Sequence, residues 1–244
     1  MIQLQSLAFG AFAEAEPLNP NFVPGHPKLR LTVDTERVPS VPDRRILQLL
    51  VETFPGLSRH RCEIGAGRPG ASPDARGIMM LEGEPSANQA HLLEHLLLEL
   101  LSIIDGRPRL SGVTCAYTEP AERNDVFVEC SHERLGEFVS LLAVEILNAD
   151  LAGETITALY GDVARVAAVV WKGEASRSWT PGEVARRTDL ALPRAAAALR
   201  ALSGMGVLRE EEFAMNFSAE PRYRATERAT ASRSPVPSSV KPGA

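Results

Sequence analysis

The chain has 244 residues, of which 44% are hydrophobic and 23% charged, and its formal net charge is −5. This length fits one large domain or two modest ones, and the composition is typical of a soluble globular protein. Residues 1–16 lack a basic segment, and no apolar run reaches about 18 residues, so we expect neither a secretory signal nor a membrane span. Three cysteines without paired spacing favour a reducing, cytoplasmic location.

Charge divides the chain into two parts. Residues 1–175 hold 15 Lys and Arg against 24 Asp and Glu, whereas residues 176–244 hold 11 against 7. Such asymmetry predicts that the two parts meet different partners.

The first part predicts strands that alternate with helices. Leu29, Leu31 and Val33 alternate along a strand, Val41-Pro42-Asp43 opens a helix that Phe54-Pro55-Gly56 closes, and residues 65–77 are predicted as loop. Predicted strands cover residues 28–35, 78–82, 111–118 and 125–130, and predicted helices cover residues 43–53, 87–104 and 135–149. We therefore expect a layered α+β domain over residues 1–150.

The predicted helix over residues 87–104, with Ser86 as its N-cap and Gly106 as its stop, contains His91-Leu92-Leu93-Glu94-His95. Positions i and i+4 lie on one helical face about one turn apart, so both imidazoles can face one ion. This H-x-x-E-H order is that of the inverted zincins, in which two histidines bind zinc and the glutamate handles the proton of the attacking water. A third protein ligand must come from elsewhere.

The polar residues of this helix gather on one side. At 100° per residue, the side chains of His91, Glu94, His95, Glu99 and Ser102 fall within an arc of about 140°. Leucine and isoleucine occupy most of the remaining circumference, so we expect the polar stripe to lie in a cleft or covered groove. The alternative is a solvated helix face without metal.

Several blocks of the first part recur in the order of a known family. They are Pro55-Gly56-Leu57, His60-Arg61-Cys62, Gly67-Arg68-Pro69-Gly70, the H-x-x-E-H helix continuing as Leu96-Leu97-Leu98-Glu99-Leu100, Val126-Phe127-Val128-Glu129, and Ala143-Val144-Glu145-Ile146-Leu147-Asn148-Ala149. Over about residues 28–150 the chain resembles the amino-terminal domain of cyanophycin synthetases, which polymerise aspartate and arginine. The family's ATP-grasp and Mur-ligase-like synthetic domains are absent, so we do not expect a synthetase.

The resemblance implies a domain that holds the polymer and, in some members, a metal-dependent hydrolytic site on this helix. His91 and His95 would then bind zinc, and Glu94 would be the general base. As third ligand we choose Glu129, which a neighbouring strand could bring over the helix, although an exposed strand carboxylate is an equal alternative.

Glu99 and Glu145 are the other candidates for the third ligand. Glu99 lies about 6 Å further along the helix axis than His95, so we expect it to orient His95 by a hydrogen bond. Glu145 is expected to be solvated. The chain departs from the family at residues 108–112 and 116–119, which leaves the substrate open between a peptide and an amino-acid polymer. An arginine-rich polymer would suit the acidic first part.

Residues 153–226 predict a helix, a second helix, a turn, a third helix and a hairpin, an order that resembles a winged helix-turn-helix domain. Thr180 is the expected N-cap of the second helix, with Pro181 at its first position, and a third helix follows from Leu192 to Leu202. The expected hairpin pairs residues 212–217 with residues 222–226. Residues 227–244, rich in Ser, Pro and Ala, are predicted to be a disordered tail.

This second domain is a candidate for DNA binding. Several arginines of this domain could contact DNA phosphates, which gives affinity with little preference for DNA sequence. They are Arg186, Arg187, Arg194, Arg200, Arg222 and Arg224. The candidate recognition helix over residues 193–200 is poor in side chains that read base edges, and Glu210-Glu211-Glu212 would oppose DNA. The alternative is that the domain serves homodimerisation or docks a protein partner.

Two functions are compatible with the sequence. In the first, the chain is a zinc-dependent peptidase-like hydrolase that acts on a peptide or a cyanophycin-like polymer. In the second, it is a non-enzymatic binding or regulatory protein that senses such a ligand and passes the signal through the winged helix to DNA or a partner.

Overall fold

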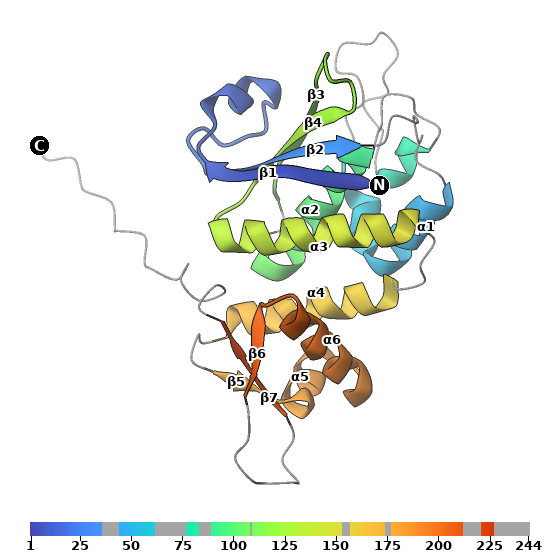
Figure 1. Cartoon of the computed structure of the whole chain (residues 1–244), viewed down its shortest axis with the longest axis vertical. Helices are drawn as coiled ribbons and strands as arrows, with labels where there is room; N and C mark the ends of the chain where they lie inside the picture. Colours follow the sequence, from blue (N-terminus) through green and yellow to red (C-terminus); the bar gives the residue numbers. More distant parts are fainter. Residues whose placement is uncertain are drawn as a thin grey trace, which may run out of the picture.

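The computed structural model of the chain describes residues 1–35, 44–61, 77–82, 89–107, 109–152, 157–173, 177–211 and 221–226. These residues form α-helices and two antiparallel sheets, arranged in layers (Figure 1). The predicted mixed helix and sheet class is therefore confirmed. None of the helices in these ranges is both long and apolar enough to cross a membrane.

The first sheet has the strand order β1-β2-β4-β3. Its strands are β1 (Ile2–Gly10), β2 (Lys28–Thr35), β3 (Gly112–Ala116) and β4 (Arg123–Glu129), and every neighbouring pair is antiparallel. Leu29, Leu31 and Val33 are fully buried on one face, as the alternation predicts. We call this the inner face of the sheet, because helices pack on it, and the opposite side the outer face.

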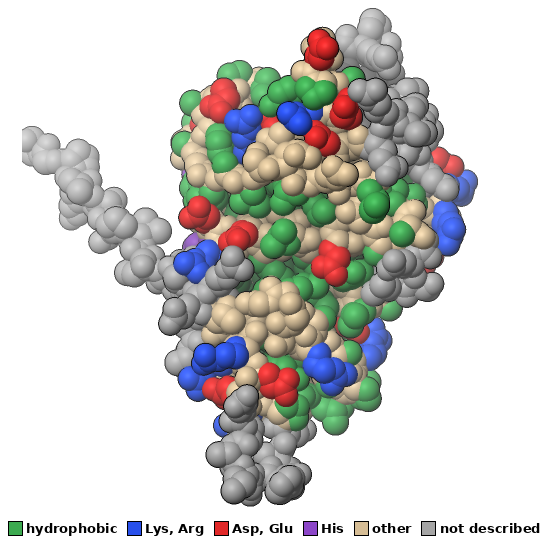
Figure 2. Space-filling view, viewed as in Figure 1, with side chains coloured by type: hydrophobic (Ala, Val, Ile, Leu, Met, Phe, Trp, Pro, Cys, Tyr) green, Lys and Arg blue, Asp and Glu red, His purple; other side chains and the backbone are tan. Residues whose placement is uncertain are grey.

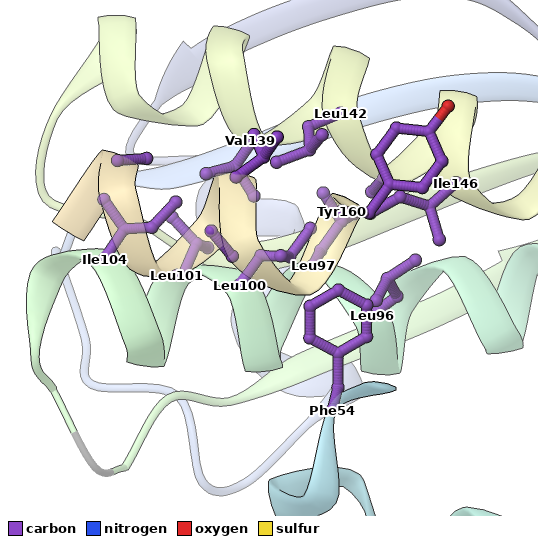
Figure 3. Packing of buried hydrophobic residues seen from close by; sticks show 14 of the residues in the cluster. Phe54, Leu96, Leu97, Leu100, Leu101, Ile104, Val139, Leu142, Ile146 and Tyr160 are labelled. Atoms are coloured by element: carbon purple, nitrogen blue, oxygen red, sulfur yellow. The ribbon is translucent and has the colours of Figure 1, made fainter. Parts of the chain in front are cut away.

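Three helices lie beneath the inner face (Figure 1): α1 (Arg44–Thr53), α2 (Gln89–Asp105) and α3 (Glu133–Leu151). Helix α2 packs on β3 and β4, and α3 packs on β1 and β2. Figure 3 shows Leu97 and Leu100 of α2 directed toward Val139 and Leu142 of α3 in one apolar layer. Residues 92–100 of α2 are all buried, so this helix is enclosed on most of its circumference.

Short 3-10 helices complete the first part of the chain: η1 (Ala13–Leu18), η2 (Pro55–Arg59) and η3 (Ile78–Leu81). Helix η1 belongs to the segment that covers the outer face, where Ala15 and Phe22 pack against Phe127. Helix η2 lies against α2 and positions a side chain of the candidate site described below.

The remaining elements form a unit below α2 (Figure 1). They are α4 (Thr157–Lys172), β5 (Ser178–Trp179), α5 (Pro181–Thr188), α6 (Leu192–Gly204), β6 (Leu208–Glu211) and β7 (Arg222–Ala225), with the antiparallel sheet order β5-β7-β6. Helix α4 packs against α1 and α2 on one side and α5 and α6 on the other, so one hydrophobic core runs through both parts of the chain.

Helix ends follow the expected chemistry. Thr180 and Glu183 form a reciprocal capping box at the start of α5, with Pro181 in the first turn. Gly106 adopts a positive φ of 78° directly after α2, and its N–H donates to the carbonyl of Ser102. The predicted stop of the H-x-x-E-H helix is therefore confirmed.

Three element predictions were wrong or incomplete. Ile78–Leu81 forms a 3-10 helix rather than a strand, because four apolar residues fit either conformation equally well. The hairpin of the second sheet begins at Leu208, since Gly206, with a φ of 72°, turns the chain from α6 directly into β6. Strand β1 was not predicted; the alternation of apolar and polar residues that begins at Ile2 breaks at Ser6, and the pairing with β2 shifts register between Leu4 and Ser6.

Several predictions fall outside the described residues. They are the helix start at Val41-Pro42-Asp43, the loop over residues 65–76, the N-cap at Ser86, the strand over residues 212–217 and the tail over residues 227–244.

Candidate metal site on helix α2

Helix α2 brings His91 and His95 together. Their Nε2 atoms are 3.1 Å apart, and the two rings are stacked with their centroids 5.0 Å apart. Nitrogens that share one zinc ion at bond lengths of about 2.0–2.1 Å in a tetrahedral site lie roughly 3.3 Å from each other. This separation is that of a hydrogen bond between the two rings, and it is also close to the separation that a common zinc ion would require.

Burial keeps these imidazoles in the form that binds metals. His95 is only 2% exposed, and burial together with the neighbouring His91 and His60 holds the pKa of His95 well below 6.5. Burial also lowers the pKa of His91. Both rings are thus neutral at pH 7, and a neutral imidazole has the nitrogen lone pair that a metal needs.

His60 is a site residue that the sequence did not reveal. It follows η2, and its Nδ1 lies 3.2 Å from Nδ1 of His95, while its Nε2 lies 3.1 Å from Oε2 of Glu99. Glu99 was expected to orient His95 directly, but it reaches His95 through the ring of His60. The signal for His60 in the sequence was its place in one of the residue blocks on which the predicted resemblance to cyanophycin synthetases rests.

If the ring of His60 carries a single proton, this chain of contacts determines which nitrogen of His95 carries its proton. The carboxylate of Glu99 accepts a hydrogen bond, so Nε2 of His60 donates it. A neutral imidazole has one donor and one acceptor nitrogen, so Nδ1 of His60 accepts from Nδ1 of His95. Nε2 of His95 is then left with a lone pair on the side that faces His91.

Glu94 is buried on the same helix and directed toward the edge strand β3. It is 7% exposed, and the hydroxyl of Thr114 donates to its Oε2 at 2.6 Å. Burial raises the pKa of Glu94 to about 7, and the bond from Thr114 opposes this shift. A carboxyl group with a pKa near the working pH can take up and release a proton, as a general base must.

Two glycines allow these carboxylates to approach the backbone. At Gly56 in η2, a Cβ atom would overlap the carboxylate of Glu99, and at Gly112 in β3 it would lie 2.9 Å from Cγ and Oε1 of Glu94. Both positions therefore need a residue without a side chain.

The competing expectation of a solvated helix face does not hold. Glu94 and Glu99 are each 7% exposed, and His95 is still less accessible. The polar stripe is covered by β3 and η2, which agrees with the prediction of a covered groove.

Glu129 lies away from the imidazoles. Side chains of a strand alternate between the two faces of a sheet, and Val128 of β4 faces Glu94 and α2. Glu129 therefore lies on the outer face, where its Oε1 accepts from the backbone N–H of Val23 and its Oε2 from that of Ser111. The structure does not bring this predicted third ligand to the site.

Glu145 is also remote from the two imidazoles. It is exposed on α3 as expected, and it accepts a hydrogen bond from the hydroxyl of Tyr160 on α4. Within the described ranges, no group of three or more His, Cys, Asp or Glu side chains is placed to hold a metal ion. The three histidines form a chain and do not converge on one point, because His95 faces His91 with one nitrogen and His60 with the other.

The arginines predicted to bind DNA have different environments. Arg186, Arg187 and Arg200 are exposed, and the guanidinium of Arg187 lies 5.5 Å from the ring centre of Trp179. Arg194 instead donates two hydrogen bonds, of 2.7 and 2.8 Å, to the carboxylate of Asp162, which is 3% exposed. This arginine attaches the start of α6 to α4.

No protein-family model matches the sequence, and no curated protein matches it either. The resemblance to cyanophycin synthetases thus stays a prediction from the residue blocks.

Proposed function

We propose that the chain is a zinc-dependent hydrolase that cleaves a peptide or an amino-acid polymer at the α2 site. The observation that carries this proposal is the pair of neutral imidazoles on one helical face, with Nε2 atoms 3.1 Å apart. His91 and His95 would hold the ion, and the third protein ligand that such a site needs would have to come from outside the described residues. When bound, zinc supplies Lewis-acid activation of water and of the scissile carbonyl.

The other polar side chains have separate roles in this proposal. Glu94 accepts the proton of the attacking water, a role for which its raised pKa of about 7 is suited. His60 and Glu99 hold the ring of His95 in the tautomer that presents Nε2. They are positioning residues, since their contacts reach the metal only through His95.

The substrate class rests on the family resemblance. A domain like that of the cyanophycin synthetases would hold a polymer of aspartate and arginine. The acidic excess of residues 1–175 supports a basic, arginine-rich chain as the substrate.

Metal analysis of the purified full-length chain tests the proposal. After reconstitution with zinc and removal of free ion, we expect one zinc per chain, lost in His91→Ala and in His95→Ala. Glu94→Gln should keep the zinc and lose cleavage of an arginine-rich aspartyl polymer or a peptide library. His26→Ala is the matched control, because this histidine is exposed and distant in the chain from α2. Zinc binding that survives both histidine substitutions would overturn the proposal.

Glu129→Gln adds an independent check of the ligand set. Because Glu129 is bound by two backbone N–H groups on the outer face, this variant should keep its zinc. Loss of zinc here, with an unchanged melting temperature, would restore Glu129 as a ligand.

A second candidate function is regulation through DNA, and the C-terminal unit favours it. The order α4, β5, α5, α6, β6, β7 and the sheet order β5-β7-β6 support the assignment of a winged helix-turn-helix. In this proposal Arg186, Arg187 and Arg200 contact phosphates, and ligand binding at α2 is passed to the DNA-binding unit through α4.

Salt dependence of DNA binding tests this second candidate. Each lost phosphate contact lowers the slope of log affinity against log salt by about 0.9. Arg186→Ala/Arg187→Ala should therefore lower the slope by about 2, whereas Arg165→Ala, an exposed arginine on α4, should leave it unchanged. A chain that retards no DNA at low salt, with or without zinc, would exclude this candidate.

A further inference from the structure

Strand β3 is the outermost strand of the first sheet (Figure 1). Among the described residues its one hydrogen-bonded neighbour is β4, so the other edge of β3 is free of strands. Just outside its two ends, the carbonyl of Ser111 accepts from the N–H of Glu129, and the N–H of Tyr117 donates to the carbonyl of Arg123. Alternate residues of an antiparallel strand bond to the same neighbour. The even-numbered residues of β3 therefore direct their N–H and carbonyl groups toward the free edge.

These outward groups belong to Gly112, Thr114 and Ala116. The carbonyl of Gly112 accepts a hydrogen bond of 2.6 Å from Nδ2 of Asn19. Within the described ranges, no group bonds to the N–H or the carbonyl of Thr114 and Ala116. Proteins often protect such an edge with a charged residue or a proline, and residues 114–116 include neither. The main chain of Thr114 and Ala116 is thus available for a further strand.

The imidazoles of the α2 site lie on the side of α2 that is nearer to this free edge. Helix α2 directs Leu100 toward α3, which packs on β1 and β2 at the other side of the sheet (Figure 3). It directs Glu94 toward β3, where Thr114 donates to the carboxylate. Continuing round the helix from Leu100 past Glu94 at 100° per residue, His91 and His95 lie about 60° and 100° beyond Glu94. A segment placed alongside β3 would therefore lie on the side where both rings project.

We propose that an extended peptide binds to β3 as an additional strand of this sheet. An antiparallel peptide would exchange two hydrogen bonds with Thr114 and two with Ala116, because these residues have the two-residue spacing of a strand. Side chains directly opposite each other point to the same face, so the peptide residue opposite Thr114 would direct its side chain toward Glu94. Figure 2 shows acidic and basic side chains interspersed around the first sheet, so on this face no single charge sign would exclude a peptide.

This binding mode narrows the substrate class of the proposed hydrolase. Only a regular backbone of α-linked amino acids presents N–H and carbonyl groups at the spacing of β3. The scissile bond would then be a main-chain peptide bond rather than a bond to a side chain. That the bound peptide is a substrate rests on the proposed function, whereas the binding itself requires neither zinc nor turnover.

N-methylated peptides test the register of binding. The probe is a decapeptide selected from a random phage-displayed library on the immobilised full-length Glu94→Gln chain, which should not cleave what it binds. This peptide is then synthesised with N-methyl groups on its odd or on its even residues, and binding is measured by fluorescence anisotropy. Because only alternate N–H groups donate to β3, one methylated peptide should bind about 10-fold more weakly and the other like the unmodified peptide. Equal affinities of the two, or a library that yields no binder, would overturn the proposal.

A proline on the edge tests the same contacts from the side of the protein. Ala116→Pro removes a donor that the ladder to β4 does not use, and a proline is tolerated at such an edge position. It should weaken peptide binding about 10-fold, whereas the matched control Ala116→Ser keeps the N–H and should bind like the wild type. Unchanged affinity in Ala116→Pro would contradict the proposal. Self-association of the wild type in sedimentation velocity that Ala116→Pro abolishes would make a second copy the occupant instead.

The results also separate this inference from the proposed hydrolase. Binding that depends on the methylation register, by a chain that holds no zinc and cleaves nothing, would support the β3 site and exclude the hydrolase. Zinc-dependent cleavage by a chain whose peptide affinity ignores the methylation register would support the hydrolase and exclude the β3 site.

Discussion

The ion pair between Arg194 and Asp162 distinguishes a structural arginine from a DNA-binding one. Nε and Nη2 of Arg194 donate to the two oxygens of Asp162 at 2.7 and 2.8 Å. The Asp162 side chain is 4% exposed and that of Arg194 is 55% exposed. Removal of the guanidinium would therefore leave a buried carboxylate without its cation.

The cost of this removal follows from the burial of the pair. Breaking a fully buried ion pair by deleting one partner costs about 3–5 kcal/mol. Because Arg194 is half exposed, solvent screens the pair, and we expect Arg194→Ala to lower the free energy of unfolding by about 2 kcal/mol. Adding Asp162→Asn removes the unpaired charge and should restore about 1 kcal/mol.

Urea unfolding at pH 7.5 measures both effects. The two tryptophans, Trp171 and Trp179, lie in α4 and β5, so their fluorescence reports on this unit. Arg165→Ala serves as the control for losing an exposed arginine on α4. If Arg194→Ala lowers the free energy of unfolding by less than about 0.5 kcal/mol and also weakens DNA retardation, the structural role is refuted. Arg194 would then be a phosphate-binding residue, as the sequence predicted.

Three further variants test the buried polar groups. Burial raises the pKa of Asp150 to about 6, so its charged form destabilises the folded state. This destabilisation is absent below about pH 4 and complete above about pH 6. We therefore expect Asp150→Asn to raise the melting temperature at pH 7.5 and to leave it unchanged at pH 4. An equal gain at both pH values would contradict this cause. Gly56→Ala would displace the carboxylate of Glu99 and should weaken zinc affinity, measured by competition with a chelator, about 10- to 100-fold. Gly112→Ala would press on Glu94 and should lower the rate of cleavage while the zinc content per chain stays that of the wild type. Loss of zinc from this last variant would mean that Glu94 is itself a ligand.

The local part of the site could be predicted from the sequence. His91 and His95 share a helical face because of their spacing, and the surrounding leucines correctly indicated that the face is covered. Gly106 could also be predicted as the end of α2, since glycine adopts a positive φ without strain. These features depend on residues within a few turns of one another.

The parts that failed depend on contacts between distant segments. His60 is 35 residues from His95, and only the packing of η2 against α2 brings them together. Glu129 was placed on the wrong face because β4 is apolar on both sides. Val126 and Val128 face the helices, but Phe127 is also buried, under the segment that contains η1. Alternation alone could not tell which of these faces meets α2.

Burial makes the charged forms of side chains in the polar stripe of α2 unfavourable, which is a feature of functional sites. Burial raises the pKa of Glu94 and lowers that of His95, so each charged form is disfavoured in the folded state. A leucine at these positions would fit a helix that is already rich in leucine. Other segments of the fold instead contact these side chains. Thr114 of β3 donates its hydroxyl to Glu94, and His60, which follows η2, contacts the ring of His95. Costly groups that several segments accommodate are typical of binding and catalytic sites.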